Sequence, residues 1–230
     1  MASIYTPGKL IGKCRTLAND KIGPPFFVTD EEYLDFLSQR QREAAVEQLL
    51  LRSAGVYSVQ AVAMSPWVTP LENMLKIDRL VRNDGGLVEP VPFSVADDAQ
   101  RCRQYSGFSL PSDWRSRTGT PQWVITDMTE DRWRLAPIPT EDMLLGYEGY
   151  VVPQPVTSVT DTVELPDEYA QHLHLGMLAD AFNVEDEDAM YDPNKALEYL
   201  NRWEAAKLGM GMAYERNRRH GGRAVRYGGL

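Results

Sequence analysis

The sequence predicts an α+β protein in which N- and C-terminal helices form one helical bundle, with an inserted small antiparallel β domain and an extended C-terminal arm. Apolar residues recur at helical spacing near both ends of the chain, whereas short Val-rich and aromatic runs broken by Pro, Gly and Asp fill the middle. We expect four segments: N-terminal bundle helices in 1–55, a β-rich insertion domain in 56–163, a C-terminal helical hairpin in 164–215 and a flexible basic arm in 216–230.

The composition is that of a folded protein. A hydrophobic content of 43% with 25% charged residues predicts a sizeable core rather than disorder. No run is long and apolar enough to span a membrane, and the N-terminus lacks a secretory pattern, so we expect no membrane partner. Cys14 and Cys102 lie outside any CxxC spacing, which is typical of reduced thiols in a cytoplasmic protein.

Helix signals are clearest near the N-terminus. We expect a first helix over residues 7–19 with Thr6 as its N-cap. A second helix follows Thr29, where the sequence TDEE predicts a capping box with Glu32, and Gly55 is its expected end.

The middle of the chain predicts strands. YSVQAVA, MLKIDRLV and LLGYEGYVV are strand candidates, and QWVITDMTEDRWRLAPIP alternates like a β-hairpin. SVADDAQRCRQY predicts a short helix or an irregular crossing. We expect Trp114, Trp123 and Trp133 in the core of this β region.

Helical periodicity returns after residue 164. One helix is expected from Pro166 to about Phe182, and Asp192 and Pro193 begin the last helix. The two helices predict an antiparallel hairpin. The last helix has an apolar stripe formed by Ala196, Tyr199, Leu200, Trp203, Ala206 and Met210.

Charge is distributed unevenly along a chain whose net charge is −9. Residues 164–192 contain nine acidic residues and no Lys or Arg, whereas residues 216–230 contain five arginines and no acidic residue. This asymmetry is typical of an interaction tail or of a chain that contacts its own copies. A solvated acidic face followed by a disordered end is the simpler alternative.

No catalytic, cofactor or metal site is predicted, so we do not expect an enzyme. His172 and His174 are two residues apart on a helix and therefore face different sides, which prevents a shared metal ion. EDED at 185–188 lacks the alternation of a calcium loop, and we expect a solvated turn there. Motifs for phosphate loops, dinucleotides and nucleophile elbows are missing from the sequence.

Several short segments together resemble a known family. In order along the chain they are LSQRQREAA, WRSRTGTPQWVITD, RWRLAPIP, LPDEYAQHLHLGMLADAF and EDEDAMYDPNKALEYLNRWEAA. Their order and spacing resemble those of the head-to-tail adaptor proteins of tailed phages, which include tail tubular protein A and the head-completion adaptors of short-tailed phages.

The resemblance implies a structural virion protein located in the tail or neck and assembled in the host cytoplasm. Such adaptors form a ring of twelve copies that binds the portal protein, extends the DNA channel and provides the platform for the tail nozzle protein. DNA would pass through the channel without specific binding, because an acidic lumen does not retain a polyanion.

The resemblance also implies that the C-terminus contacts the portal. Glycines would give the arm flexibility, and arginines would form bidentate pairs with portal carboxylates. The expected docking residues are Arg216, Arg218, Arg219, Arg223, Arg226, Tyr227 and Leu230. Two alternatives stay open: nucleic-acid binding through the Arg/Gly tail, and a cell-wall hydrolase.

Overall fold

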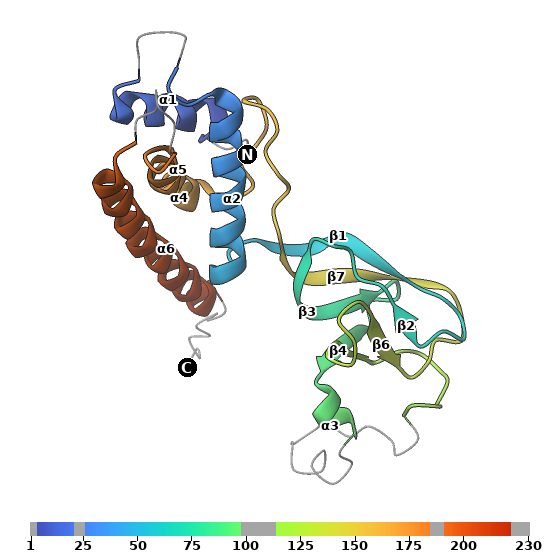
Figure 1. Ribbon diagram of the computed structural model, residues 1–230. Coiled ribbons are helices and arrows are strands. Elements are labelled where there is room, and N and C mark those ends of the chain that lie inside the picture. The colour runs from blue at the N-terminus through green and yellow to red at the C-terminus, as the bar shows by residue number, and fades with distance from the viewer. Residues whose placement is uncertain (1–3, 21–25, 98–113, 185–190, 222–230) are drawn as a thin grey trace, which may run out of the picture. The chain divides into compact units, whose positions relative to one another are not determined.

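The computed structural model describes residues 4–20, 26–97, 114–184 and 191–221 (Figure 1). The fold is α+β, as expected. The chain divides into two compact units: residues 1–51 with 152–230, here called the helical unit, and residues 52–151, here called the β unit. No helix in the described ranges is long and apolar enough to cross a membrane.

Local capping signals position the first two helices. The hydroxyl of Thr6 accepts a hydrogen bond from the Lys9 amide at the start of α1 (Pro7–Ala18). The expected capping box of α2 (Asp30–Gln48) is present, because Thr29 and Glu32 exchange side-chain to backbone hydrogen bonds of 3.2 and 2.8 Å. The expected end of this helix at Gly55 is wrong.

The second helix ends earlier because Leu49 adopts a left-handed conformation with φ of 50°. Its amide donates to the Ala45 carbonyl, which closes the helix. Gly55, with φ of 74°, instead lies in the first strand where its pairing register shifts, between Ala54 and Ser58.

The C-terminal helices differ from the expectation in two places. The single helix expected from Pro166 is divided into α4 (Asp167–Ala170) and α5 (Leu173–Ala181). The last helix, α6 (Pro193–Gly221), begins as expected, with the Asp192 carboxylate accepting from the Lys195 amide at 3.1 Å. It continues to Gly221, so the flexible arm expected from residue 216 is wrong for residues 216–221.

The helices of this unit share one hydrophobic core. Helix α5 contacts α1, α2 and α6, and most of its side chains are buried. The apolar stripe of α6 faces this core: Trp203 is fully buried, and Ala196 and Met210 are nearly so. The rings of Tyr199 and Phe182 stack with centroids 5.7 Å apart, joining α6 to the end of α5.

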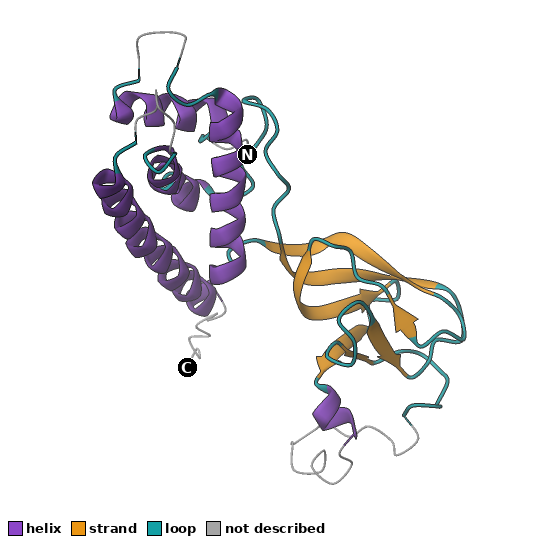
Figure 2. Cartoon of the chain, in the orientation of Figure 1, coloured by secondary structure: helices purple, strands orange, loops and turns teal. Residues whose placement is uncertain are grey.

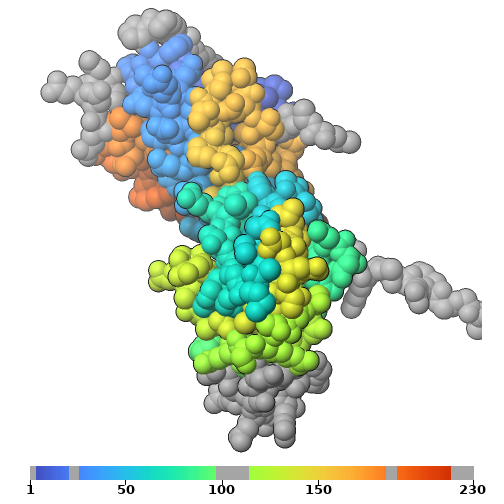
Figure 3. Space-filling view, turned by 90° about the vertical axis from the view of Figure 1, so that its right-hand side faces the viewer, coloured from blue at the N-terminus to red at the C-terminus, as the bar shows by residue number. Residues whose placement is uncertain are grey.

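A segment without regular secondary structure, residues 152–165, lies along α2 (Figure 3, amber beside blue). Gln41 is completely buried, and its side-chain oxygen accepts from the Glu164 amide at 3.1 Å. The Ser38 hydroxyl accepts from the Val156 amide at 2.8 Å. These bonds satisfy backbone groups that would otherwise be buried without partners.

The β unit contains a seven-stranded sheet with the order β1-β7-β3-β4-β5-β6-β2. Figure 2 shows the strands in orange. The long strands β1, β3 and β7 pair side by side and antiparallel. The strands are β1 (Arg52–Ala61), β2 (Trp67–Val68), β3 (Met74–Arg82), β4 (Leu87–Val91), β5 (Trp123–Ile125), β6 (Trp133–Ala136) and β7 (Met143–Val151).

The predicted hairpin is confirmed, because β5 and β6 pair antiparallel with Val124 opposite Leu135. The expectation of a purely antiparallel sheet is wrong, because β4 and β5 pair in parallel, with Val91 opposite Ile125. A parallel pair requires a crossover. The connection includes the expected short helix, α3 (Phe93–Asp97), and residues outside the described ranges.

Two of the three tryptophans expected in the β core are buried: Trp114 is 5% exposed and Trp133 is 9% exposed. Trp123 is partly buried against a hydrophobic cluster formed by Val91, Ala96, Trp114, Ile125 and Ala136. The Trp133 ring also stacks on Tyr147, with centroids 6.3 Å apart. These rings therefore connect β6 to β7 through their faces.

Candidate interaction site on the C-terminal helix

The expected docking residues divide into two groups. Arg216 and Arg218 lie exposed on the last turns of α6, and Arg219 belongs to the same helical stretch. Arg223, Arg226, Tyr227 and Leu230 lie outside the described residues. Three of the five arginines thus belong to the helix α6.

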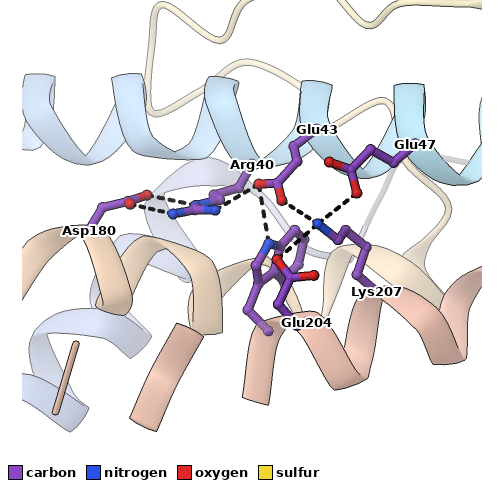
Figure 4. A network of polar contacts seen from close by, with 7 residues as sticks. Arg40, Glu43, Glu47, Asp180, Glu204 and Lys207 are labelled. Carbon is purple, nitrogen blue, oxygen red and sulfur yellow. Dashed lines mark hydrogen bonds and ion pairs between the residues drawn. The ribbon is translucent and has the colours of Figure 1, made fainter. Parts of the chain in front are cut away.

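A buried lysine holds α6 against α2. The Lys207 side chain is 4% exposed, and its ammonium contacts three carboxylates (Figure 4). Glu47 lies at 2.7 Å and Glu204 at 3.0 Å, and Glu43 is the third partner. An ammonium has three donors, so these carboxylates satisfy its full donor capacity.

The network continues to α5 through Arg40. The Arg40 guanidinium lies between two carboxylates: it donates to Asp180 at 2.8 Å and to Glu43 at 2.7 Å. The Trp203 indole donates to the same Glu43 carboxylate at 3.2 Å. Glu43 therefore links α2 with α6, while Arg40 links α2 with α5 (Figure 4).

The network favours the charged forms of Glu43 and Lys207. Burial alone would raise the pKa of Glu43, but hydrogen bonds from Lys207 and Arg40 outweigh burial and hold that pKa below its ordinary value. Burial alone would lower the pKa of Lys207, but its carboxylate partners raise it. Because breaking one partner would leave an uncompensated buried charge, the network fixes how α6 lies on α2.

Glycine permits the close approach of α5 to this network. A Cβ atom at Gly176 would lie 2.7 Å from Cδ of Arg40, inside van der Waals contact. The sequence alone does not predict the network, since Lys207 and Glu43 are 164 residues apart. One local signal was present: Lys207 lies four residues after Trp203, within the apolar stripe of its helix.

The face of α6 that is turned away from the core carries three exposed apolar side chains among polar ones. Leu197, Leu208 and Met212 are 57, 58 and 70% exposed. Their spacing of eleven and four residues places them on one side of the helix. Exposed apolar side chains gathered on one face are typical of a contact surface.

The histidines do not meet in the structure as metal ligands. His174 is buried, and its Nδ1 lies 2.7 Å from the Gln171 carbonyl and 3.3 Å from the Lys13 ammonium. Within the described ranges, no group of three or more His, Cys, Asp or Glu side chains could hold a metal ion. The EDED turn at 185–188 lies outside those ranges.

The described cysteine is shielded from solvent. Cys14 is completely buried, and burial raises the pKa of its thiol to about 12. Cys102, by contrast, lies outside the described residues.

Comparison with known families gives the class of protein. One family model, described as SU10 adaptor protein, matches residues 5–226. The match therefore covers both the helical unit and the β unit. This is a class of phage structural adaptors, virion components of the head-tail connector type. Because the match covers nearly the whole chain, the protein belongs to the SU10 adaptor protein family.

The family confirms the resemblance to phage head-to-tail adaptors and favours a non-enzymatic role over the hydrolase alternative. The comparison with curated proteins finds no match.

Proposed function

We propose that the protein assembles as a ring that binds the portal protein and extends the DNA channel. The ring has twelve copies, as in the phage adaptors that the sequence resembles. The ring then provides the platform for the tail nozzle protein in the neck of the virion, after assembly in the host cytoplasm. The observation that carries this proposal is the SU10 adaptor family match over residues 5–226.

Helix α6 supplies the proposed portal contact. Its middle is fixed by the Lys207 network, and its last turns present Arg216 and Arg218 to solvent. The final fifteen residues carry five arginines and no acid in a chain of net charge −9. Guanidinium groups match carboxylates bidentately, so this terminus suits an acidic surface on the portal. Tyr227 and Leu230 would add apolar anchors at the far end.

The exposed apolar face of α6 supplies the proposed contact between neighbouring copies. A neighbouring copy that covered Leu197, Leu208 and Met212 would remove their apolar surface from water, which favours association. In a closed ring every copy makes the same contact with the next, so one such face per chain is sufficient. DNA passes through without specific binding, because the acidic body repels it.

A truncation ending at Gly221 tests the portal contact without removing any described residue. We expect the truncated protein to keep the wild-type circular dichroism and melting temperature, while its co-sedimentation with the portal protein of the same phage falls about tenfold or more. An unchanged affinity would contradict a docking role for residues 222–230, which include Arg223, Arg226, Tyr227 and Leu230.

Arginine chemistry is tested separately. Replacing Arg216, Arg218 and Arg219 together by lysine keeps the charge and removes the planar fork, so portal binding should weaken. Arg202→Lys is the matched control, because Arg202 lies earlier on α6 and pairs with Glu198. Equal binding by the triple variant, with strong salt dependence and affinity for oligonucleotides, would favour the nucleic-acid alternative.

A further inference from the structure

Arginine and tryptophan side chains alternate on the β unit. The Arg134 guanidinium of β6 lies 5.3 Å from the ring centre of Trp67 and 5.4 Å from that of Trp114. Arg132 lies 5.7 Å from the Trp67 ring, and Arg115 lies 5.4 Å from the Trp114 ring. These five residues, here called the Arg–Trp ladder, are within cation–π range at each step.

The guanidinium carbons of Arg132 and Arg134 lie over the Trp67 ring, and N–H groups are the polar atoms of the ladder. A guanidinium that stacks through its flat face keeps its N–H donors at its rim, where they match the two oxygens of a carboxylate. The Arg132 side chain is 51% exposed, and its contact with Asp131, at 3.3 Å, is an exposed pair that contributes little. Arg132 is therefore accessible to an external anion.

The positive charge of Arg134 is not neutralised within the described part of the chain. Arg134 forms no ion pair there; its Nη2 donates to the Arg115 carbonyl at 2.6 Å, and its buried Nε has no hydrogen-bond partner. Burial lowers the pKa of Arg134, and the neighbouring Arg115 cation lowers it further. A bound anion would offset this repulsion between like charges.

We propose that the Arg–Trp ladder binds a carboxylate-rich segment of a partner protein through the exposed guanidinium of Arg132, with the charge of Arg134 beside it adding attraction. Two observations favour an acidic protein segment over nucleic acid. The ladder's own guanidiniums lie against Trp67 and Trp114, so these rings are not open platforms on which bases stack. In addition, a chain with net charge −9 repels a long polyanion, whereas a short acidic segment presents its charge locally.

The test measures fluorescence polarisation of a labelled peptide of alternating glutamate and glycine, titrated with the full-length protein at low salt. We expect saturable binding that weakens about fivefold in Arg132→Gln and less in Arg132→Lys, because an exposed charge pair has a modest energy. Arg79→Gln is the matched control, since Arg79 is a 43% exposed arginine of the same unit that already pairs with Glu148 at 2.6 Å.

Three results would overturn the proposal. They are the lack of saturable peptide binding to the wild-type protein, an equal loss of affinity in the Arg79→Gln control, and tighter binding of a labelled oligothymidine of the same net charge. Melting curves of all three variants accompany the titrations, and Arg132→Lys preserves the stacked cation if Arg132→Gln unfolds the β unit.

Discussion

The ammonium of Lys207 on α6 lies against the carboxylate of Glu43 on α2, and this contact joins helices from opposite ends of the chain. The Lys207 side chain is 4% exposed and Glu43 is 22% exposed. A charge pair this deep fixes position more than it adds stability, because desolvation offsets much of the attraction. The last helix, with its terminal arginines, is thereby held in one register on the helical unit.

Removing the lysine should destabilise the helical unit. Lys207→Ala removes the cation shared by Glu43, Glu47 and Glu204 and leaves Glu43 with Arg40 as its remaining cation, so we expect a loss of about 3 kcal/mol in the free energy of unfolding. Urea denaturation followed by circular dichroism measures it. Lys195→Ala on the same helix is the control, because Lys195 is 57% exposed and its loss should change stability by less than about 0.5 kcal/mol. Equal effects of the two substitutions would contradict an anchoring role for Lys207.

Two glycines of β7 should respond differently to alanine. A Cβ at Gly149 would lie 2.3 Å from the Lys76 carbonyl and 2.6 Å from the Tyr147 hydroxyl, whereas at Gly146 the nearest atom is 3.5 Å away. The Tyr147 hydroxyl cannot simply move, because it donates to the carbonyls of Lys76 and Tyr150. We expect Gly149→Ala to cost about 1–3 kcal/mol in thermal unfolding, and Gly146→Ala much less. A reversed order would show that β7 lies differently against β3.

Mild acid should destabilise the protein through His174. Burial, and then the charge of Lys13, lower the pKa of His174 from 6.5 to about 4. Between these values the unfolded chain takes up a proton that the folded protein does not, so stability is complete above pH 6.5 and falls as pH decreases toward 4.

His174→Gln should therefore lose less stability than the wild type when the pH is lowered from about 7 to about 5, as read from urea midpoints. His172, whose pKa is also lowered by burial, remains in both proteins, so the comparison isolates His174. Equal losses of stability in the wild type and in His174→Gln would contradict the assignment of the acid sensitivity to His174.

Local signals predicted the fold best. The Thr29–Glu32 capping box, the β5–β6 hairpin and the buried face around Trp203 all depend on residues close in sequence, and all three are confirmed. Such features follow from capping chemistry and hydrophobic periodicity, which act within a few residues.

Features that depend on distant residues were missed. The parallel pairing of β4 with β5 depends on a crossover, which no short pattern encodes. The continuation of α6 past residue 215 was missed because its glycines, Gly209 and Gly211, indicated a weakening helix. The arginines of residues 216–230, which are part of the candidate site, could be predicted from the uneven charge distribution along the sequence. The contacts of Lys207 with α2 could not, because they depend on tertiary packing.

The central claim is that the protein is a ring-forming adaptor on the phage portal. Electron microscopy of the purified protein, alone and mixed with the portal protein of the same phage, tests it most directly. The account predicts that rings of this protein are seen on portal particles, and that the protein alone is monomeric or weakly associated. Portal particles that stay bare at saturating protein, or stable rings that form without portal and do not attach to it, would contradict the account.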